Sequence, residues 1–185
     1  MKITHILIAF AVLFPASLSF AEESCKATKY KMLDDSIAFG TPFASAKRTL
    51  NRKFDSKAVV LSPRSNTIVV MFHQPYNNLQ KIIYLATDGK ITRVLFTYSD
   101  DFTRKFGGTA DMFKVLWPKL KAKYGEQKDL STDEAKDQVK LFWPRHEGAT
   151  LTLLADNDTI DLRIDCDALE EAIRAKASGS ANFGF

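Results

Sequence analysis

The sequence has few residues of the kinds that bind metals or form catalytic pairs. Only two of its 185 residues are cysteine and three are histidine. Cys25 and Cys166 are too far apart to form a CxxC motif, and only His73 and His146 offer an imidazole outside the amino-terminal segment. We therefore expect no metal site and no cofactor.

Long apolar runs are missing after the first 21 residues. The opening segment has one early lysine, an apolar run over residues 6–14 and small residues before Ala21, as in a cleavable secretory signal. That run is too short for a transmembrane helix, which needs about 20 residues. Cys25 does not follow the small residues of a lipobox. We expect cleavage near Ala21 and a periplasmic or secreted protein with no transmembrane segment.

Charge of one sign is not concentrated in any block. The chain carries 26 basic and 22 acidic residues, and removal of the predicted signal takes away a single lysine. So small an excess is typical of an ordinary protein surface. We therefore expect no nucleic-acid partner.

The two cysteines lie near opposite ends of the predicted mature chain. Export would place them in an oxidising compartment, where a disulfide between Cys25 and Cys166 is the natural pairing. Such a bond would close a loop of about 140 residues, which the chain-entropy model values at roughly 5 kcal/mol of unfolding free energy.

Apolar periodicity predicts three helices and seven strands. We expect Thr41 to cap a helix that begins at Pro42 and Thr109 to cap the second helix, which Pro118 should kink or split. The third helix begins at about Asp167. The Asp88-Gly89 pair predicts a tight hairpin turn. The expected strands span residues 58–62, 67–73, 79–86, 91–98, 139–143, 149–155 and 159–166.

The order of these elements repeats, and short sequence matches accompany it. "VLSPRSNTIVV" resembles "LFWPRHEGATLTL", and "LATDGKI" resembles "LADNDTI". We therefore expect an α+β fold made of a duplicated helix-plus-antiparallel-meander unit, with helices packed on one face of antiparallel sheet and a short C-terminal helix. The predicted domains are a signal peptide (1–21), a first α+β half (22–104), a second α+β half (105–177) and a flexible tail (178–185).

The stretch "FWPRHEG" carries the most chemically suggestive cluster. Trp143, Arg145 and His146 could form a binding loop, and a hydrolase site near the turn from Trp143 to Glu147 is the alternative. The corresponding "PRSN" of the first half has neither histidine nor glutamate, and no nucleophile is evident to work with His146. We therefore favour a solvated hairpin turn and predict no catalytic residue.

Other groups are better explained as turns or solvated surfaces. The acidic pairs Asp34-Asp35 and Asp100-Asp101 are expected in loops, and Gly107-Gly108 lacks a phosphate-loop lysine. Asp156, Asp158 and Asp161 lack the glycine and distal glutamate of a calcium loop. The basic residues of the first two helices favour a solvated face, with an acidic partner as the alternative. They are Lys47, Arg48, Arg52, Lys53, Lys119, Lys121 and Lys123.

A Gly-Thr helix start, an apolar-faced helix and a following meander resemble small exported modules of the SmpA/BamE type and the repeats of β-lactamase inhibitor protein. The likeness covers residues 37–166 in outline. It implies a module that binds an envelope protein or peptide and catalyses nothing. We therefore expect an exported, non-catalytic binding protein of the bacterial envelope, with a periplasmic hydrolase as the alternative.

Overall fold

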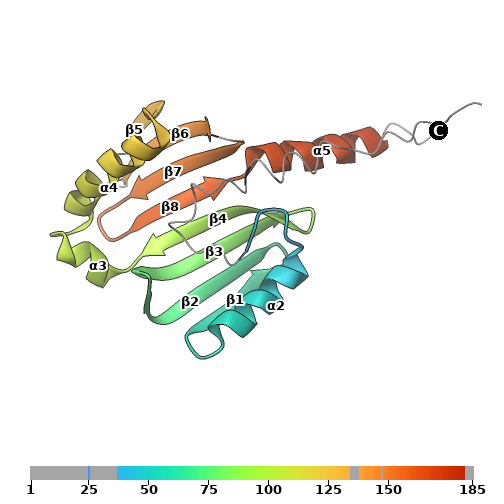
Figure 1. Cartoon of the computed structure of the whole chain (residues 1–185), viewed down its shortest axis with the longest axis horizontal. Coiled ribbons are helices and arrows are strands. Elements are labelled where there is room, and N and C mark those ends of the chain that lie inside the picture. The colour runs from blue at the N-terminus through green and yellow to red at the C-terminus, as the bar shows by residue number, and fades with distance from the viewer. Residues whose placement is uncertain (1–24, 26–36, 134–137, 147, 182–185) are drawn as a thin grey trace, which may run out of the picture.

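The computed structural model describes Cys25 and residues 37–133, 138–146 and 148–181, which form one antiparallel sheet of eight strands with four helices. The strand order across the sheet is β1-β2-β3-β4-β8-β7-β6-β5, so the strands β4 and β8 meet at its centre (Figure 1). The strands are β1 (Ala58–Arg64), β2 (Thr67–Tyr76), β3 (Leu79–Thr87), β4 (Lys90–Tyr98), β5 (Asp129–Asp133), β6 (Gln138–His146), β7 (Ala149–Ala155) and β8 (Ile160–Asp165).

Tight turns join the strands of the first meander. Asp88 and Gly89 connect β3 to β4 with φ angles of 47° and 70°, and Asn77 and Asn78 connect β2 to β3 with φ angles of 50° and 66°. Asparagine, aspartate and glycine tolerate this left-handed conformation better than other residues. The hairpin predicted at Asp88-Gly89 is therefore confirmed.

The helices are α2 (Phe43–Phe54), α3 (Asp100–Lys105), α4 (Thr109–Tyr124) and α5 (Asp167–Ala181). The Phe54 ring of α2 packs edge-on against Phe72 of β2, with their centroids 5.1 Å apart. At the end of α4, the Trp143 indole of β6 donates a hydrogen bond to the Gly125 carbonyl oxygen at 2.9 Å. Both contacts lie on one side of the sheet, which we call the covered face.

The covered face holds most of the core. Cross-strand registers align its apolar side chains in rows, such as Ile82 beside Phe96 and Leu162 beside Leu153. These four side chains are buried, and Leu50 and Phe54 of α2 and Met112 and Leu120 of α4 are buried with them. Burying a large apolar side chain contributes about 1.5–3 kcal/mol, so this layer supplies most of the stability.

The prediction of a duplicated helix-plus-meander unit is wrong. The described chain forms a single sheet whose central strands β4 and β8 pair over five residue positions, from Arg93 opposite Asp165 to Thr97 opposite Asp161. One helix precedes the first four strands, two helices precede β5, and another follows β8. The sequence matches reflect turn residues and apolar alternation, which any two antiparallel hairpins share. The expectation that helices pack against antiparallel sheet agrees with the structure.

Several boundaries differ from the predicted ones. Residues 129–133, where no strand was predicted, form the edge strand β5, and Asp100 and Asp101 open the short helix α3. Pro118 lies inside α4 without splitting it. Thr41 and Thr109 do not cap helices, because the N-cap positions of α2 and α4 are Pro42 and Gly108.

The predicted disulfide is confirmed. Cys25 and Cys166 are bonded, with their Cα atoms 5.8 Å apart across 141 positions of sequence. Both residues are buried, and Cys166 joins β8 to α5. The predicted signal peptide, residues 1–21, lies outside the described residues. Within the described part of the chain, no helix is both long and apolar enough to cross a bilayer.

Candidate binding surface

The second side of the sheet, which we call the open face, differs from the covered face in composition. Its side chains alternate with those of the core, so a single strand such as β3 sends Ile82 and Tyr84 to the covered face and Ile83 and Leu85 to the open face. Along β1–β3 the open-face positions are exposed or half-buried. Towards the centre of the sheet they become polar and buried.

An aliphatic patch covers the open face of the first four strands. Its most exposed members are Val59, Leu61 and Met71, whose exposed fractions are 44%, 46% and 48%. The cross-strand registers place Met71 beside Val59, and Val69 beside both Leu61 and Ile83. The complete patch consists of Val59, Leu61, Val69, Met71, Ile83, Leu85 and Leu95. Contiguous exposed apolar surface of this kind is a common mark of a binding site.

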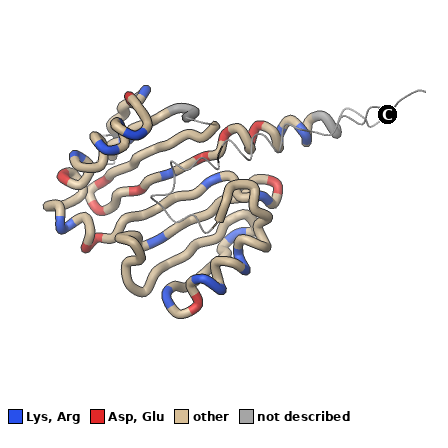
Figure 2. The backbone as a smooth tube through the Cα atoms, viewed as in Figure 1, with Lys and Arg blue, Asp and Glu red and all other residues tan. Residues whose placement is uncertain are grey.

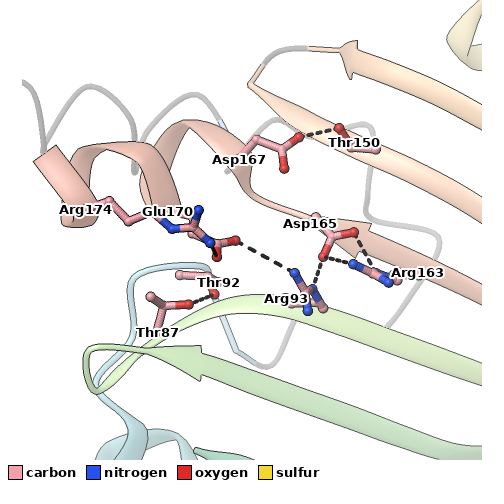
Figure 3. A network of polar contacts seen from close by, with 9 residues as sticks. All are labelled: Thr87, Thr92, Arg93, Thr150, Arg163, Asp165, Asp167, Glu170 and Arg174. Carbon is pink, nitrogen blue, oxygen red and sulfur yellow. Dashed lines mark hydrogen bonds and ion pairs between the residues drawn. The ribbon is translucent and has the colours of Figure 1, made fainter.

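A cluster of charged residues adjoins the patch at the centre of the sheet (Figure 3). Asp165 of β8 is 5% exposed and is bound by two arginines, Arg93 of β4 and Arg163 of its own strand. Arg163 donates two hydrogen bonds to the carboxylate, at 2.7 and 3.1 Å. Because a carboxylate bound on both oxygens is held firmly, this cluster fixes the pairing of β4 with β8.

The first turns of α5 complete the charged cluster. Glu170 lies 3.8 Å from Arg93 and 2.6 Å from Arg174, while Asp167 accepts a hydrogen bond from the Thr150 hydroxyl of β7 (Figure 3). A shallow cavity of about 360 Å³ lies between Arg93 and α5. Its arginines are already paired with carboxylates, so the cluster stabilises the junction of β4, β8 and α5.

Asp161 is a second acidic group on the open face. It lies opposite Thr97 of β4, and Asp161 Oδ1 and Thr97 Oγ1 are buried without a hydrogen-bond partner among the described residues. Burial is the main cause that raises the pKa of Asp161, and the negative charge of Asp156 adds to it. The neighbouring Thr97 hydroxyl and, to a smaller extent, the Lys81 ammonium oppose this rise.

The Asp156–Asp158 segment is a turn, as its sequence predicts. The Asp156 carboxylate accepts hydrogen bonds from the backbone amides of Asp158 and Thr159, at 3.0 and 2.6 Å. Slight burial acts to raise the pKa of Asp156, but these bonds together with the Thr159 hydroxyl leave it lowered. No group of three or more His, Cys, Asp or Glu within the described residues could hold a metal ion.

The structure separates the predicted binding residues Trp143, Arg145 and His146. The Trp143 side chain is 1% exposed and belongs to the core, so it offers no surface to a ligand. Arg145 and His146 are the last residues of β6. Their side chains and the whole of Glu147 are not among the parts of the chain that the structure describes. A hydrolase site near this turn therefore stays a prediction. The acidic pair Asp34-Asp35 also lies outside the described residues.

The sequence showed the alternation that produces the aliphatic patch, yet it did not reveal the patch. Both faces of β1–β4 are apolar, as Val59, Val60 and Leu61 illustrate. Such a pattern is typical of a strand covered on both sides. The sequence did not indicate which face of the sheet α2 would cover. That choice depends on a long-range contact, the packing of Phe54 against Phe72.

The sequence matches no protein-family model and no curated protein. A solved structure similar to this chain is a DUF4309 family protein from Bacillus subtilis, with a TM-score of 0.42, 11% identity, and coverage of 80% of this chain and 97% of that chain. Another is a GTP-binding regulator from Thermotoga maritima, with a TM-score of 0.30, 14% identity, and coverage of 72% and 85%. Neither likeness is close enough to transfer a fold or a function, and neither tests the resemblance to SmpA/BamE-type modules.

Proposed function

We propose that this chain is an exported, non-catalytic binding module of the bacterial envelope whose partner is a protein or an extended peptide. The observation that carries the proposal is the aliphatic patch, which leaves Val59, Leu61 and Met71 nearly half exposed. Residues of this type at an exposed sheet surface lose contact with water when a partner covers them, at about 25 cal/mol for each Å².

The position of the patch favours an extended partner. It extends onto β1, which is one of the two edge strands of the sheet. A peptide that adds a strand to such an edge gains main-chain hydrogen bonds, and its alternate side chains meet the neighbouring surface. The register shift between Leu61 and Arg64 and the proline at position 63 limit this pairing to the first half of β1.

Export is part of the proposal. The Cys25–Cys166 disulfide supports it, because such bonds persist in oxidising compartments. We propose cleavage of residues 1–21 and a periplasmic or secreted location. Mass spectrometry of the protein released by a bacterial host should find Glu22 at its amino terminus. A lipid adduct on Cys25 would contradict this proposal.

Site-specific photo-crosslinking tests the binding surface. A photoreactive phenylalanine analogue placed at Leu61 or Met71 should form a discrete crosslinked product in envelope extracts, whereas the same analogue at Lys119 of α4 should not. Met71→Asp, introduced beside the analogue at Leu61, should remove the product. Equal products at all three positions would contradict the proposal. The analogue is also placed at position 145. A crosslinked product from this position alone would place the binding surface at the turn between β6 and β7, and it would favour the hydrolase hypothesis.

A further inference from the structure

The outer surface of α2 carries a row of basic residues. Ala46, Leu50 and Phe54 are its buried residues and face the sheet. Ser45, Arg48, Thr49 and Arg52 repeat at three- and four-residue intervals on the opposite side of the helix. The two arginines therefore lie one turn apart and point away from the molecule.

These two arginines differ from four other arginines of the described chain, which form ion pairs. Arg93 and Arg163 bind Asp165, Arg104 binds Asp101, and Arg174 binds Glu170. Within the described residues, neither Arg48 nor Arg52 forms an ion pair, and the hydrogen bond of Arg48 goes to a hydroxyl.

Acidic residues are also scarce in the sequence of this helix and the turn after it. Residues 43–57 hold five basic residues against one acidic, whereas residues 100–126, which include α3 and α4, hold six against four. Figure 2 shows basic positions gathered along α2 with a single acidic position near its end. On α4, Lys114 pairs with Asp111 at 2.8 Å and Lys121 pairs with Glu126 at 2.6 Å. Within the described residues, Arg48 and Arg52 thus lack the ion pairs that Lys114 and Lys121 form on α4.

The two arginines line an open groove of about 390 Å³ together with Ser45 and Thr49. Arg48 Nη2 donates a hydrogen bond to Ser45 Oγ at 3.2 Å, which holds its guanidinium along the groove. Guanidinium groups donate hydrogen bonds in pairs to planar or tetrahedral oxyanions, and hydroxyls can donate further bonds to the same anion.

We propose that the Ser45–Arg52 groove binds a phosphate group. Two guanidinium groups one turn apart supply the positive charge and the forked donors, and Ser45 and Thr49 supply hydroxyl donors. The phosphate can belong to an anionic lipid headgroup or to a free phosphate, since the recognition chemistry is the same. The groove lies on the helix side of the sheet and the aliphatic patch on the other side, so both surfaces can be occupied together.

Vesicle sedimentation and titration calorimetry test this proposal on the mature full chain. We expect binding to vesicles that contain phosphatidylglycerol and none to pure phosphatidylcholine vesicles. R48Q/R52Q should weaken this binding roughly 30-fold, the effect of two cations at an anionic surface. The matched control K114Q/K121Q removes the same charge from α4 and should change binding less than threefold. All four positions are exposed or half-buried helix surface, and melting curves will confirm that the variants fold.

A second arm identifies the source of the phosphate and separates geometry from charge. Binding of inorganic phosphate that R48Q/R52Q abolishes would support a free phosphate ligand, while binding to vesicles alone would support a lipid headgroup. R48K/R52K keeps the charge but loses the forked donors, so it should bind several-fold more weakly than the unmodified chain. Unchanged binding by R48K/R52K, an equal loss in K114Q/K121Q, or no binding of either probe by the unmodified chain would overturn the proposal.

Discussion

The two faces of the sheet are built from the same strands, yet they differ in what their side chains do. On the covered face, Leu153 and Leu141 are fully buried beneath the helices. On the open face, Leu61 and Met71 remain nearly half exposed, and charged residues replace apolar ones at the centre. The comparison shows that apolar alternation alone does not make a core, because one apolar face is covered and the other is left for recognition.

The largest expected change in unfolding free energy follows removal of the disulfide. This change tests whether both faces of the sheet unfold as one cooperative unit. Replacing Cys25 and Cys166 together by serine should lower the unfolding free energy by up to about 5 kcal/mol, because the bond restricts the unfolded chain. Urea unfolding followed by the fluorescence of Trp117 and Trp143 and by hydrogen exchange in β1 should shift to the same new midpoint. Reducing agent should lower the stability of the unmodified chain and leave the double variant unchanged. Detection of two accessible thiols in the native, unreduced protein would contradict the presence of the disulfide.

A matched pair of leucines compares the two faces directly. Leu153→Ala removes a fully buried side chain from the covered face and should cost about 2–5 kcal/mol of unfolding free energy. Leu61→Ala removes a side chain that is 46% exposed on the open face, and it should cost under about 1 kcal/mol. Urea denaturation gives both values. Similar losses in the two variants would mean that the open face is also part of the core.

The charged cluster tests whether the centre of the open face contributes to stability. Asp165→Ala would leave Arg93 and Arg163 without their shared carboxylate and should cost about 2 kcal/mol, less than for a fully buried pair because both arginines are partly exposed. The control, Asp101→Ala, breaks an exposed pair with Arg104 and should cost under about 0.5 kcal/mol. Chemical denaturation at low and high salt measures both. Equal costs would show that the cluster is only a surface feature.

The smallest effect should come from Asp161, and it depends on pH. Burial raises its pKa above the ordinary value of 3.8, so the folded chain binds this proton more tightly than the unfolded chain. Stability contributed by this group is therefore full below pH 3.8 and decreases as pH rises through the raised pKa. Asp161→Asn should raise the urea midpoint at pH 7, and the gain should vanish near pH 3. Asp158→Asn, an exposed change in the turn before β8, is the control for the loss of one negative charge.

Local features of the fold were readable from the sequence. Seven strands, three helices and the disulfide follow from apolar periodicity, turn residues and cysteine count. Strand β5 was missed because "DLSTD" has little apolar alternation, and its pairing with β6 comes from tertiary structure. Helix α3 had a readable signal, since Ser99 precedes two acidic residues and accepts a hydrogen bond from the Phe102 amide.

The arrangement of the sheet and the site depended on long-range contacts. Short similarities between "LATDGKI" and "LADNDTI" suggested two equivalent units, but the pairing of β4 with β8 merges the strands into one sheet. The basic residues of α2 were recognised as a helix face with a possible acidic partner. That Arg48 and Arg52 form no ion pair within the described residues became clear only when the ion pairs of α4 could be compared with them.

The disulfide also has a mechanical consequence. A tensile load applied to the chain before Cys25 and after Cys166 passes through the sulfur–sulfur bond, so it bypasses every strand between them. The sheet would therefore carry no load when the two ends are pulled apart, and among the described helices and strands the force would act on α5 alone. After reduction the same force would reach β1 at one edge through α2 and β8 at the centre, and it would pull these strands away from their neighbours. In the oxidised state the covalent bond thus shields both surfaces from force on the chain ends.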